Sequence, residues 1–218
     1  MRSRSACCLS LVAVAIAAWP ASAQAPELAE LLDRMASSAG VEASFHETKE
    51  LSLLAVPLES RGVIYFAPPG RFARFTTEPD DSALIVRQGE IRMREGRDAP
   101  EVDLSGNRIA RVFTDNIVVL WSGDRERLDE LYTAAFRGEL SQWEIALAPR
   151  DSRMAEVIEE IVLRGNAAGM TEMVIRERDG DRTITRFENV DNDRVFTPEE
   201  IERIFVTGEP LDPVGEAR

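Results

Sequence analysis

The segment 57–77 most constrains the fold, because its side chains alternate and then the chain turns at a proline corner. One phase of a two-residue repeat carries the dry side chains: Leu58, Gly62, Ile64 and Phe66. This alternation is typical of an antiparallel strand with one apolar face. Pro68-Pro69-Gly70 ends the strand, because proline lacks a backbone donor and glycine tolerates a tight turn. A second strand over 71–77 follows, so the segment predicts a hairpin that lines either a core or a groove.

The remaining sequence predicts one helix, a series of strands and a helix inserted among them. Apolar residues at helical spacing predict a helix over 26–38. The segment 107–121 also follows the helical period, although its Val118 and Val119 favour strands. Thr197 is the expected cap of a short helix that begins at Pro198. Period-two patterns predict the other strands: 41–55 with a bulge near Thr48, 83–87, 91–95, 101–104, 131–137, 142–147, 157–163, 170–176 and 182–187.

These elements predict a mainly β protein with helices, of the α+β class, built on one strongly curved antiparallel sheet. The segment 1–23 is expected to be a signal peptide, because Arg2 and Arg4 precede a short apolar run and Ala21-Ser22-Ala23 is a cleavage site. A membrane span needs about 20 apolar residues, and this run is shorter. We therefore expect a single domain over 24–207 and a flexible tail over 208–218.

Cysteine usage and charge narrow the classes of function. Cys7 and Cys8 both lie in the expected signal peptide, so the mature chain would have no disulfide and no thiolate metal site. An exported chain without cysteine indicates the periplasm as its location. The formal net charge of -13 argues against nucleic acid as a partner, because like charges repel.

The residues that usually carry chemistry are sparse. His46 is the only histidine, which excludes a histidine-based metal site. Asp191-Asn-Asp193 begins like a calcium loop but lacks the glycine that such a loop requires. No Gly-x-Ser-x-Gly elbow is present. The sequence therefore favours a binding protein without cofactor or catalysis, while a hydrolase with a carboxylate pair from distant strands stays an alternative.

Several motifs, in this order, carry a resemblance to a known family. A helix at the N-terminus precedes Phe45-His-Glu-Thr-Lys49, then Pro57-Leu-x-Ser-x-Gly62 and a strand that ends in Pro68-Pro-Gly-Arg-Phe72. Trp143-x-Ile-x-Leu147-x-Pro149 follows later. Together they resemble a divergent side branch of the LolA-type periplasmic lipoprotein carriers, over most of 26–190.

This resemblance implies an unclosed antiparallel β-barrel, or half-barrel, with a helical lid over an apolar cavity. It also implies a monomeric carrier of lipoprotein acyl chains or another lipid-like cargo, which receives cargo from an inner-membrane donor protein and delivers it to an outer-membrane acceptor protein. No cofactor is implied. The sequence departs from the family where the carriers have an arginine before the corner proline, here Pro68, and where an aromatic residue is expected, here Arg74.

The curved sheet needs something to fill its inner face, either side chains or a ligand. If a ligand fills it, the expected lining of the apolar cavity is Phe45, Ile64, Phe66, Phe72, Phe75, Ile85, Met93, Phe113, Leu120 and Trp121. Arg74 is the expected contact for an anionic head group at the rim. The alternative function is a non-catalytic periplasmic sensor or regulatory module that binds a membrane partner protein, since related half-barrels act in this way.

Overall fold

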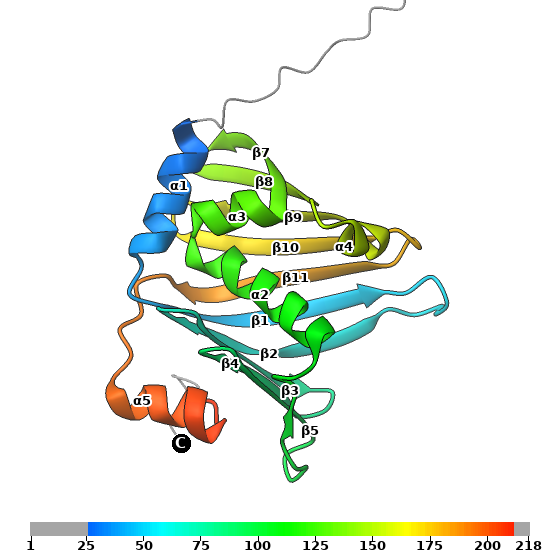
Figure 1. The fold of residues 1–218 in the computed structure, drawn as a ribbon, viewed down its shortest axis with the longest axis vertical. Coiled ribbons are helices and arrows are strands. Elements are labelled where there is room, and N and C mark those ends of the chain that lie inside the picture. Colours follow the sequence, from blue (N-terminus) through cyan, green and yellow to red (C-terminus); the bar gives the residue numbers. More distant parts are fainter. Residues whose placement is uncertain (1–25, 212–218) are drawn as a thin grey trace, which may run out of the picture.

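The computed structural model describes residues 26–211, apart from the side chains of 108–113 and 115. The expected signal peptide 1–23 and most of the expected tail 208–218 lie outside the described residues. The described strands form one antiparallel sheet that does not close, in the order β6-β5-β4-β3-β2-β1-β11-β10-β9-β8-β7 (Figure 1). This arrangement confirms the predicted half-barrel class.

The strands and helices follow the expected sequence closely. The strands are β1 Val41–Glu50, β2 Leu58–Ala67, β3 Arg71–Glu78, β4 Ser82–Arg87, β5 Glu90–Glu95, β6 Val102–Asp103, β7 Tyr132–Glu139, β8 Gln142–Pro149, β9 Ile158–Asn166, β10 Gly169–Glu177 and β11 Arg182–Asp191. The helices are α1 Pro26–Ser37, α2 Arg108–Ser122, α3 Arg125–Leu131, α4 Ser152–Val157, α5 Pro198–Glu202 and the π-helical turn η1 Arg203–Thr207. No helix in the range 26–211 is long and apolar enough to cross a membrane.

The centre of the sheet joins the first strand to the last. Every other pair of neighbouring strands follows directly in the sequence, but β1 pairs with β11 along most of its length, with His46 opposite Arg186. Two meanders, β1 to β6 and β7 to β11, are therefore held together through this one long-range pairing. The sheet is continuous only because the last strand pairs with the first.

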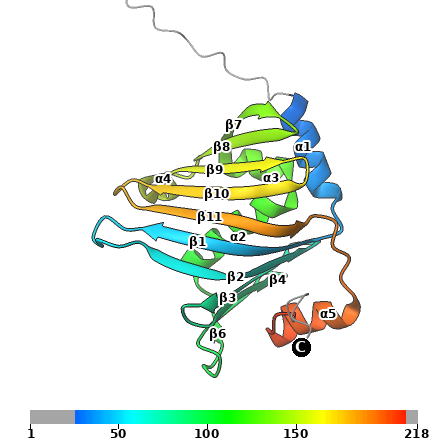
Figure 2. The same ribbon diagram turned by 180° about the vertical axis from the view of Figure 1, so that it is seen from behind.

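Helices cover one face of the sheet and, on the other face, the part formed by β2 to β4. We call the face under α1, α2 and α3 the inner face, and the face under α5 and η1 the outer face (Figures 1 and 2). The inner-face cluster includes Phe45, Ile64 and Trp121, and α1 adds the buried Leu28 and Leu32. A smaller cluster on the outer face is made by residues of β2, β3 and β4 with two residues of η1: Tyr65, Ala67, Ala73, Phe75, Ala83, Ile85, Ile204 and Phe205.

Two local expectations were wrong in detail. The first strand ends at Glu50 rather than at residue 55, because Lys49 already pairs with Leu58 and the residues between form a loop without a partner strand. The irregularity in β1 lies between Glu42 and Ser44, away from Thr48. Helix α3 was not predicted, since seven residues show too little periodicity. Its start is fixed by Asp124, whose side chain accepts a hydrogen bond from the Arg127 backbone N–H.

The helix predicted around Val118 and Val119 is confirmed as α2. Intrinsic propensity is a weak preference that tertiary packing overrides, and Val119 is buried against the inner face. The cap predicted at Thr197 is also confirmed, and it is part of a capping box. Thr197 and Glu200 bond reciprocally to each other's backbone N–H groups, with Pro198 at the first helical position.

Gly62 provides a test of the close packing between β2 and β3. A Cβ atom there would lie 1.9 Å from the Phe75 carbonyl oxygen and 2.8 Å from Cε1 of Phe45. We expect Gly62→Ala to lower the free energy of unfolding by about 1–3 kcal/mol through overpacking, measured by urea denaturation. Gly106→Ala is the matched control, because a Cβ at Gly106 meets nothing within 4 Å. Equal denaturation midpoints for the two variants would contradict this packing.

Candidate functional site

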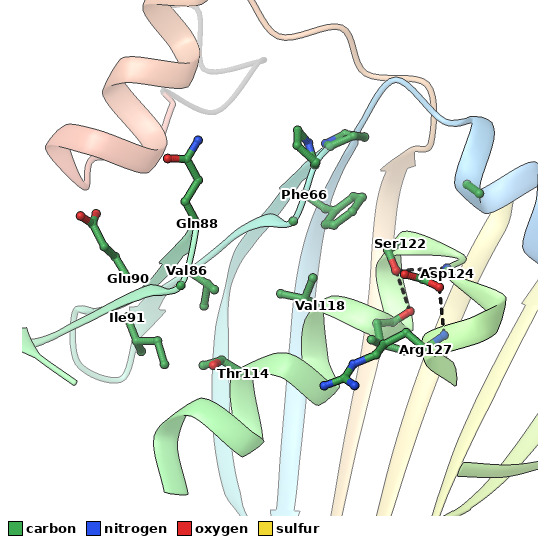
Figure 3. A pocket seen from close by; sticks show the side chains of 16 residues that line it. Phe66, Val86, Gln88, Glu90, Ile91, Thr114, Val118, Ser122, Asp124 and Arg127 are labelled. Atoms are coloured by element: carbon green, nitrogen blue, oxygen red, sulfur yellow. Dashed lines mark hydrogen bonds between the residues drawn. The ribbon is translucent and has the colours of Figure 1, made fainter. Parts of the chain in front are cut away.

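A groove of about 1060 Å³ opens on the inner face, between the edge of the sheet and α2. Three segments surround it: the β2–β3 corner at 68–70, the β4–β5 turn at 88–90, and the half of α2 that runs from Thr114 to Ser122. Figure 3 shows Phe66, Val86 and Val118 turned toward the space between sheet and helix. The groove is therefore framed by the turns of two hairpins and roofed by one helix.

The floor of this groove is apolar because the register of four strands places apolar residues opposite one another. Phe66 of β2 pairs with Phe72 of β3, Phe72 pairs with Val86 of β4, and Val86 pairs with Ile91 of β5. Directly opposite residues on antiparallel strands point to the same face. Phe66, Val86 and Ile91 line the groove, and α2 adds Val118 and Val119 from above.

Polar and charged residues surround the mouth of the groove. They are Gln88, Glu90, Ser122, Asp124 and Arg127. Glu90 accepts a hydrogen bond of 2.8 Å from Arg87, and Arg127 forms an ion pair of 2.7 Å with Glu130. An apolar floor under a polar rim suits a molecule with a hydrocarbon part and a polar head. Within 26–211, no group of three or more histidine, cysteine, aspartate or glutamate residues is placed to hold a metal ion.

The structure divides the residues expected to line a cavity into three groups, apart from Met93 and Phe113. Phe66 lines the groove. Five others belong to the inner-face cluster and are packed as core, with at most 4 % of each residue exposed: Phe45, Ile64, Phe72, Leu120 and Trp121. Met93 lies opposite Leu84 and is half-buried. The side chain of Phe113 lies outside the described residues.

Phe75 and Ile85 form the third group and lie on the outer face. Phe75 stands three residues after Phe72, and an odd spacing along a strand reverses the face. Its ring contacts Tyr65 edge to face, with 6.0 Å between centroids, and the cluster is covered by Ile204 and Phe205. Counting in steps of two from Phe72 along β3 would have placed Phe75 on the opposite face from the sequence alone.

Arg74 lies on the inner face but does not line the groove. It is opposite Ile64 on β2, two residues along β3 from Phe72. Its guanidinium carbon lies 4.3 Å from the centroid of the Phe45 ring, and its Nη2 donates to Oε1 of Glu47 at 3.0 Å. Glu47 is not among the site residues predicted from the sequence, where it stands only within the motif Phe45-His-Glu-Thr-Lys49. The signal was the phase of β1, in which Glu47 follows Phe45 by two residues.

Glu47 is a buried carboxylate, with only 4 % of the residue exposed. Its Oε2 accepts a hydrogen bond of 3.1 Å from the Thr185 hydroxyl, and the Lys49 Nζ lies 3.9 Å from Oε1. Burial alone would raise the pKa of Glu47, but Arg74, Lys49 and Thr185 together outweigh burial and hold the pKa below its usual value. Glu177 of β10 also interacts with Lys49, so the carboxylates of Glu47 and Glu177 offset the charges of Arg74 and Lys49 on this part of the inner face.

Comparison with known proteins gives one family match. The profile of the family described as "Outer membrane lipoprotein carrier protein LolA-like" matches residues 20–205. No curated protein matches the sequence.

Several solved structures have a similar fold. A DUF1329 family protein from Desulfovibrio piger is 12% identical, with a TM-score of 0.48, over 82% of this chain and 94% of the other. A LolA superfamily protein from Nitrosomonas europaea is 10% identical, with a TM-score of 0.45, over 83% and 97%. The MucA/MucB complex structure from Pseudomonas aeruginosa contains a chain that is 12% identical, with a TM-score of 0.45, over 80% of this chain and 60% of that one.

The pair of Glu47 and Arg74 predicts a pH-dependent contribution to stability. Because the folded-state pKa of Glu47 is lowered, the contribution is present above its unfolded pKa of about 4.3 and is lost as the pH falls through the folded value. Arg74→Met should cost about 1–3 kcal/mol at pH 7, since it leaves a buried carboxylate without its main donor. Urea denaturation at pH 7 and pH 3 should show a smaller loss at the lower pH. An equal loss at both values would contradict the ion pair.

Proposed function

The chain belongs to the family of LolA-like outer membrane lipoprotein carrier proteins, and we propose that it is a periplasmic carrier that shields acyl chains during transfer between membranes. The membership agrees with the resemblance drawn from the sequence motifs. In this proposal, the cargo is a lipoprotein or another lipid-like molecule with acyl chains. The chain receives it from a donor protein at the inner membrane, releases it to an acceptor at the outer membrane, and carries out no reaction on it.

One observation carries this proposal: the groove combines an apolar floor with a polar rim. Ligand pockets typically have volumes of about 300–1,000 Å³, and this groove, at about 1060 Å³, is of that size. Burial of one methylene group from water contributes about 0.8 kcal/mol. An acyl chain along Phe66, Val86 and Val118 would therefore bind without any polar contact, and the rim would take up the head group.

In the proposal, longer acyl chains enter the inner-face cluster, whose side chains move apart to make room. Helix α2, which carries Leu120, would act as the lid over Phe72. Gly123, which joins α2 to α3, is pressed against α1, since a Cβ there would lie 2.4 Å from the Leu32 carbonyl oxygen. This contact holds the C-terminal end of α2 in place. In the proposal, opening therefore occurs at the N-terminal end of the helix, toward β5.

Arg74 is the proposed contact for an anionic head group of a chain that runs beneath α2. It lies on the same face as Phe72, and its side chain is 29% exposed. Its guanidinium already pairs with Glu47, so an anionic head group would share the guanidinium with that carboxylate. Phe45 supports the guanidinium from below, so the charged group is held in one place.

Val118→Asp tests the groove directly. A carboxylate in the roof of the groove would lose its hydration when an acyl chain binds, so we expect the dissociation constant for a fluorescent fatty-acyl probe to rise at least about ten-fold. Val102→Asp is the matched control, because Val102 is 53% exposed on β6 and does not line the groove. Unchanged affinity in Val118→Asp would place the bound chain elsewhere.

Arg74→Ala tests the head-group contact. We expect it to weaken the binding of an acyl chain with an anionic head group about ten-fold, and to leave a chain with a zwitterionic head group nearly unaffected. Fluorescence titration at pH 7 makes this comparison, at a temperature well below the thermal unfolding midpoint of the variant. Equal affinities of parent and variant for the anionic ligand would remove Arg74 from the site.

Native mass spectrometry of the mature protein from a periplasmic extract, followed by lipid extraction, tests the proposed class of function. A bound mass of lipid size would support the carrier and identify the class of cargo. A lipid-free mass, no uptake of the acyl probe and a stoichiometric protein partner would instead favour the alternative, a sensor or regulatory module.

A further inference from the structure

The loop between β1 and β2 exposes an unusual number of large apolar side chains. The stretch from Leu51 to Leu58 has the sequence Leu-Ser-Leu-Leu-Ala-Val-Pro-Leu, without a charged residue between Glu50 and Glu59. We call its most exposed large side chains the apolar tip; they are Leu53 at 95%, Val56 at 72%, Leu58 at 50% and Leu54 at 47% exposed. Leu53 is almost fully in water, so the tip contributes little to the fold.

The apolar tip stands at one end of the sheet, where two other segments meet it. The backbone N–H of Ser52 donates to Oδ1 of Asp181 in the β10–β11 turn at 2.7 Å. Arg178 of the same turn donates its backbone N–H to the carbonyl oxygen of Val157 at 2.9 Å. Val157, at the end of α4, is itself 54% exposed. Figures 1 and 2 both show the β1–β2 loop, the β10–β11 turn and α4 at the same end of the molecule.

The ion pairs behind the apolar tip are accompanied by further carboxylates, because Glu177, Asp179 and Asp181 lie together in and beside the β10–β11 turn. Arg182 pairs with Glu50 at 2.9 Å, and Arg176 pairs with Glu160. His46 lies 2.6 Å from Glu59. This end of the protein therefore has no excess of positive charge that would attract an anionic surface, and its carboxylates disfavour anionic lipid but not a zwitterionic surface.

The composition of the tip distinguishes between two kinds of partner. The residues that anchor protein–protein interfaces are enriched in tryptophan, tyrosine and arginine, and leucine and valine are under-represented among them. The loop has neither an aromatic residue nor an arginine. Leucine and valine are the residues that enter bilayer hydrocarbon most favourably. A convex loop with separate aliphatic side chains suits a fluid phase better than a shaped protein pocket.

We propose that the apolar tip docks the protein reversibly on a zwitterionic phospholipid surface, by inserting Leu53 and Val56 into the outer part of the hydrocarbon. The inference rests on the proposed carrier function, for which a short stay at a membrane is useful. Lys49 and Arg74 lie on the inner face toward the same end of β1 and β3, so docking would bring the inner face close to the lipid. A single short apolar anchor gives weak and reversible binding, as a shuttle requires.

The test uses cargo-free mature protein and vesicles of phosphatidylcholine in a sedimentation assay. The double variant Leu53→Asp/Val56→Asp should reduce the partition coefficient at least about ten-fold, since charged side chains do not enter hydrocarbon. The matched control is Val195→Asp, because Val195 is 69% exposed but lies between β11 and α5. Parent binding should change little between low and high salt. Urea denaturation should give the same midpoint for all three proteins.

Uptake of the fluorescent acyl probe in the absence of vesicles separates this inference from the proposed function. Loss of vesicle binding with unchanged probe uptake in the double variant supports membrane docking. Equal vesicle binding of parent and double variant overturns it, as does a parent that takes up the probe but binds no vesicles or needs anionic lipid. A parent that binds vesicles through the tip but takes up no probe overturns the carrier function and leaves the docking intact.

Discussion

The structure depends on one constraint: a face of the antiparallel sheet must be covered wherever it carries large apolar residues. Each strand points its side chains alternately to the inner and outer face, and β2 to β4 carry large apolar residues on both. Helices α1, α2 and α3 cover the inner face, and α5 with η1 covers the outer face. Arg92 strengthens the outer cover, because its Nη2 donates to the carbonyl oxygens of Phe205 and Val206 at 2.9 Å each. The C-terminal helix is thus part of the core.

The apolar part of the outer face is covered by α5 and η1, whereas β8 to β11 present exposed ion pairs there, so the apolar groove lies on the inner face. Most of that face is filled, with Phe45, Ile64 and Trp121 nearly inaccessible to water. The groove remains where the sheet edge extends beyond α2, and the Phe66 and Val86 side chains that form its floor are themselves buried. A protein that carries a long apolar molecule faces two demands, since it must hide its apolar face when empty and expose it when loaded. A packed core next to an open groove, under one helix, meets both.

The inner face also contains a buried polar group. Glu47 lies in the row of β1 that otherwise faces the core, and it remains ionised because Arg74, Thr185 and Lys49 surround it. A buried carboxylate without such partners would be neutral or strongly destabilising. The ion pair of Glu47 and Arg74 lies between the apolar inner-face cluster and the more exposed end of the sheet. The apolar tip lies beyond this boundary, where its side chains serve no packing purpose.

Alternation and turn residues are local signals that the chain carries along its length. The class of fold, the succession of strands along the chain and the family could therefore be predicted from the sequence. The hairpin at Pro68-Pro69-Gly70 and the cap at Thr197 were predicted in this way. Only the tertiary structure decided which apolar residues are core and which line a groove. Phe66 and Phe72 occupy the same face and share one strand pairing, yet helix α2 leaves only the first beside the groove. The pairing of β1 with β11 and the burial of Glu47 beside Arg74 also arise between residues far apart in the chain, where no local pattern can record them.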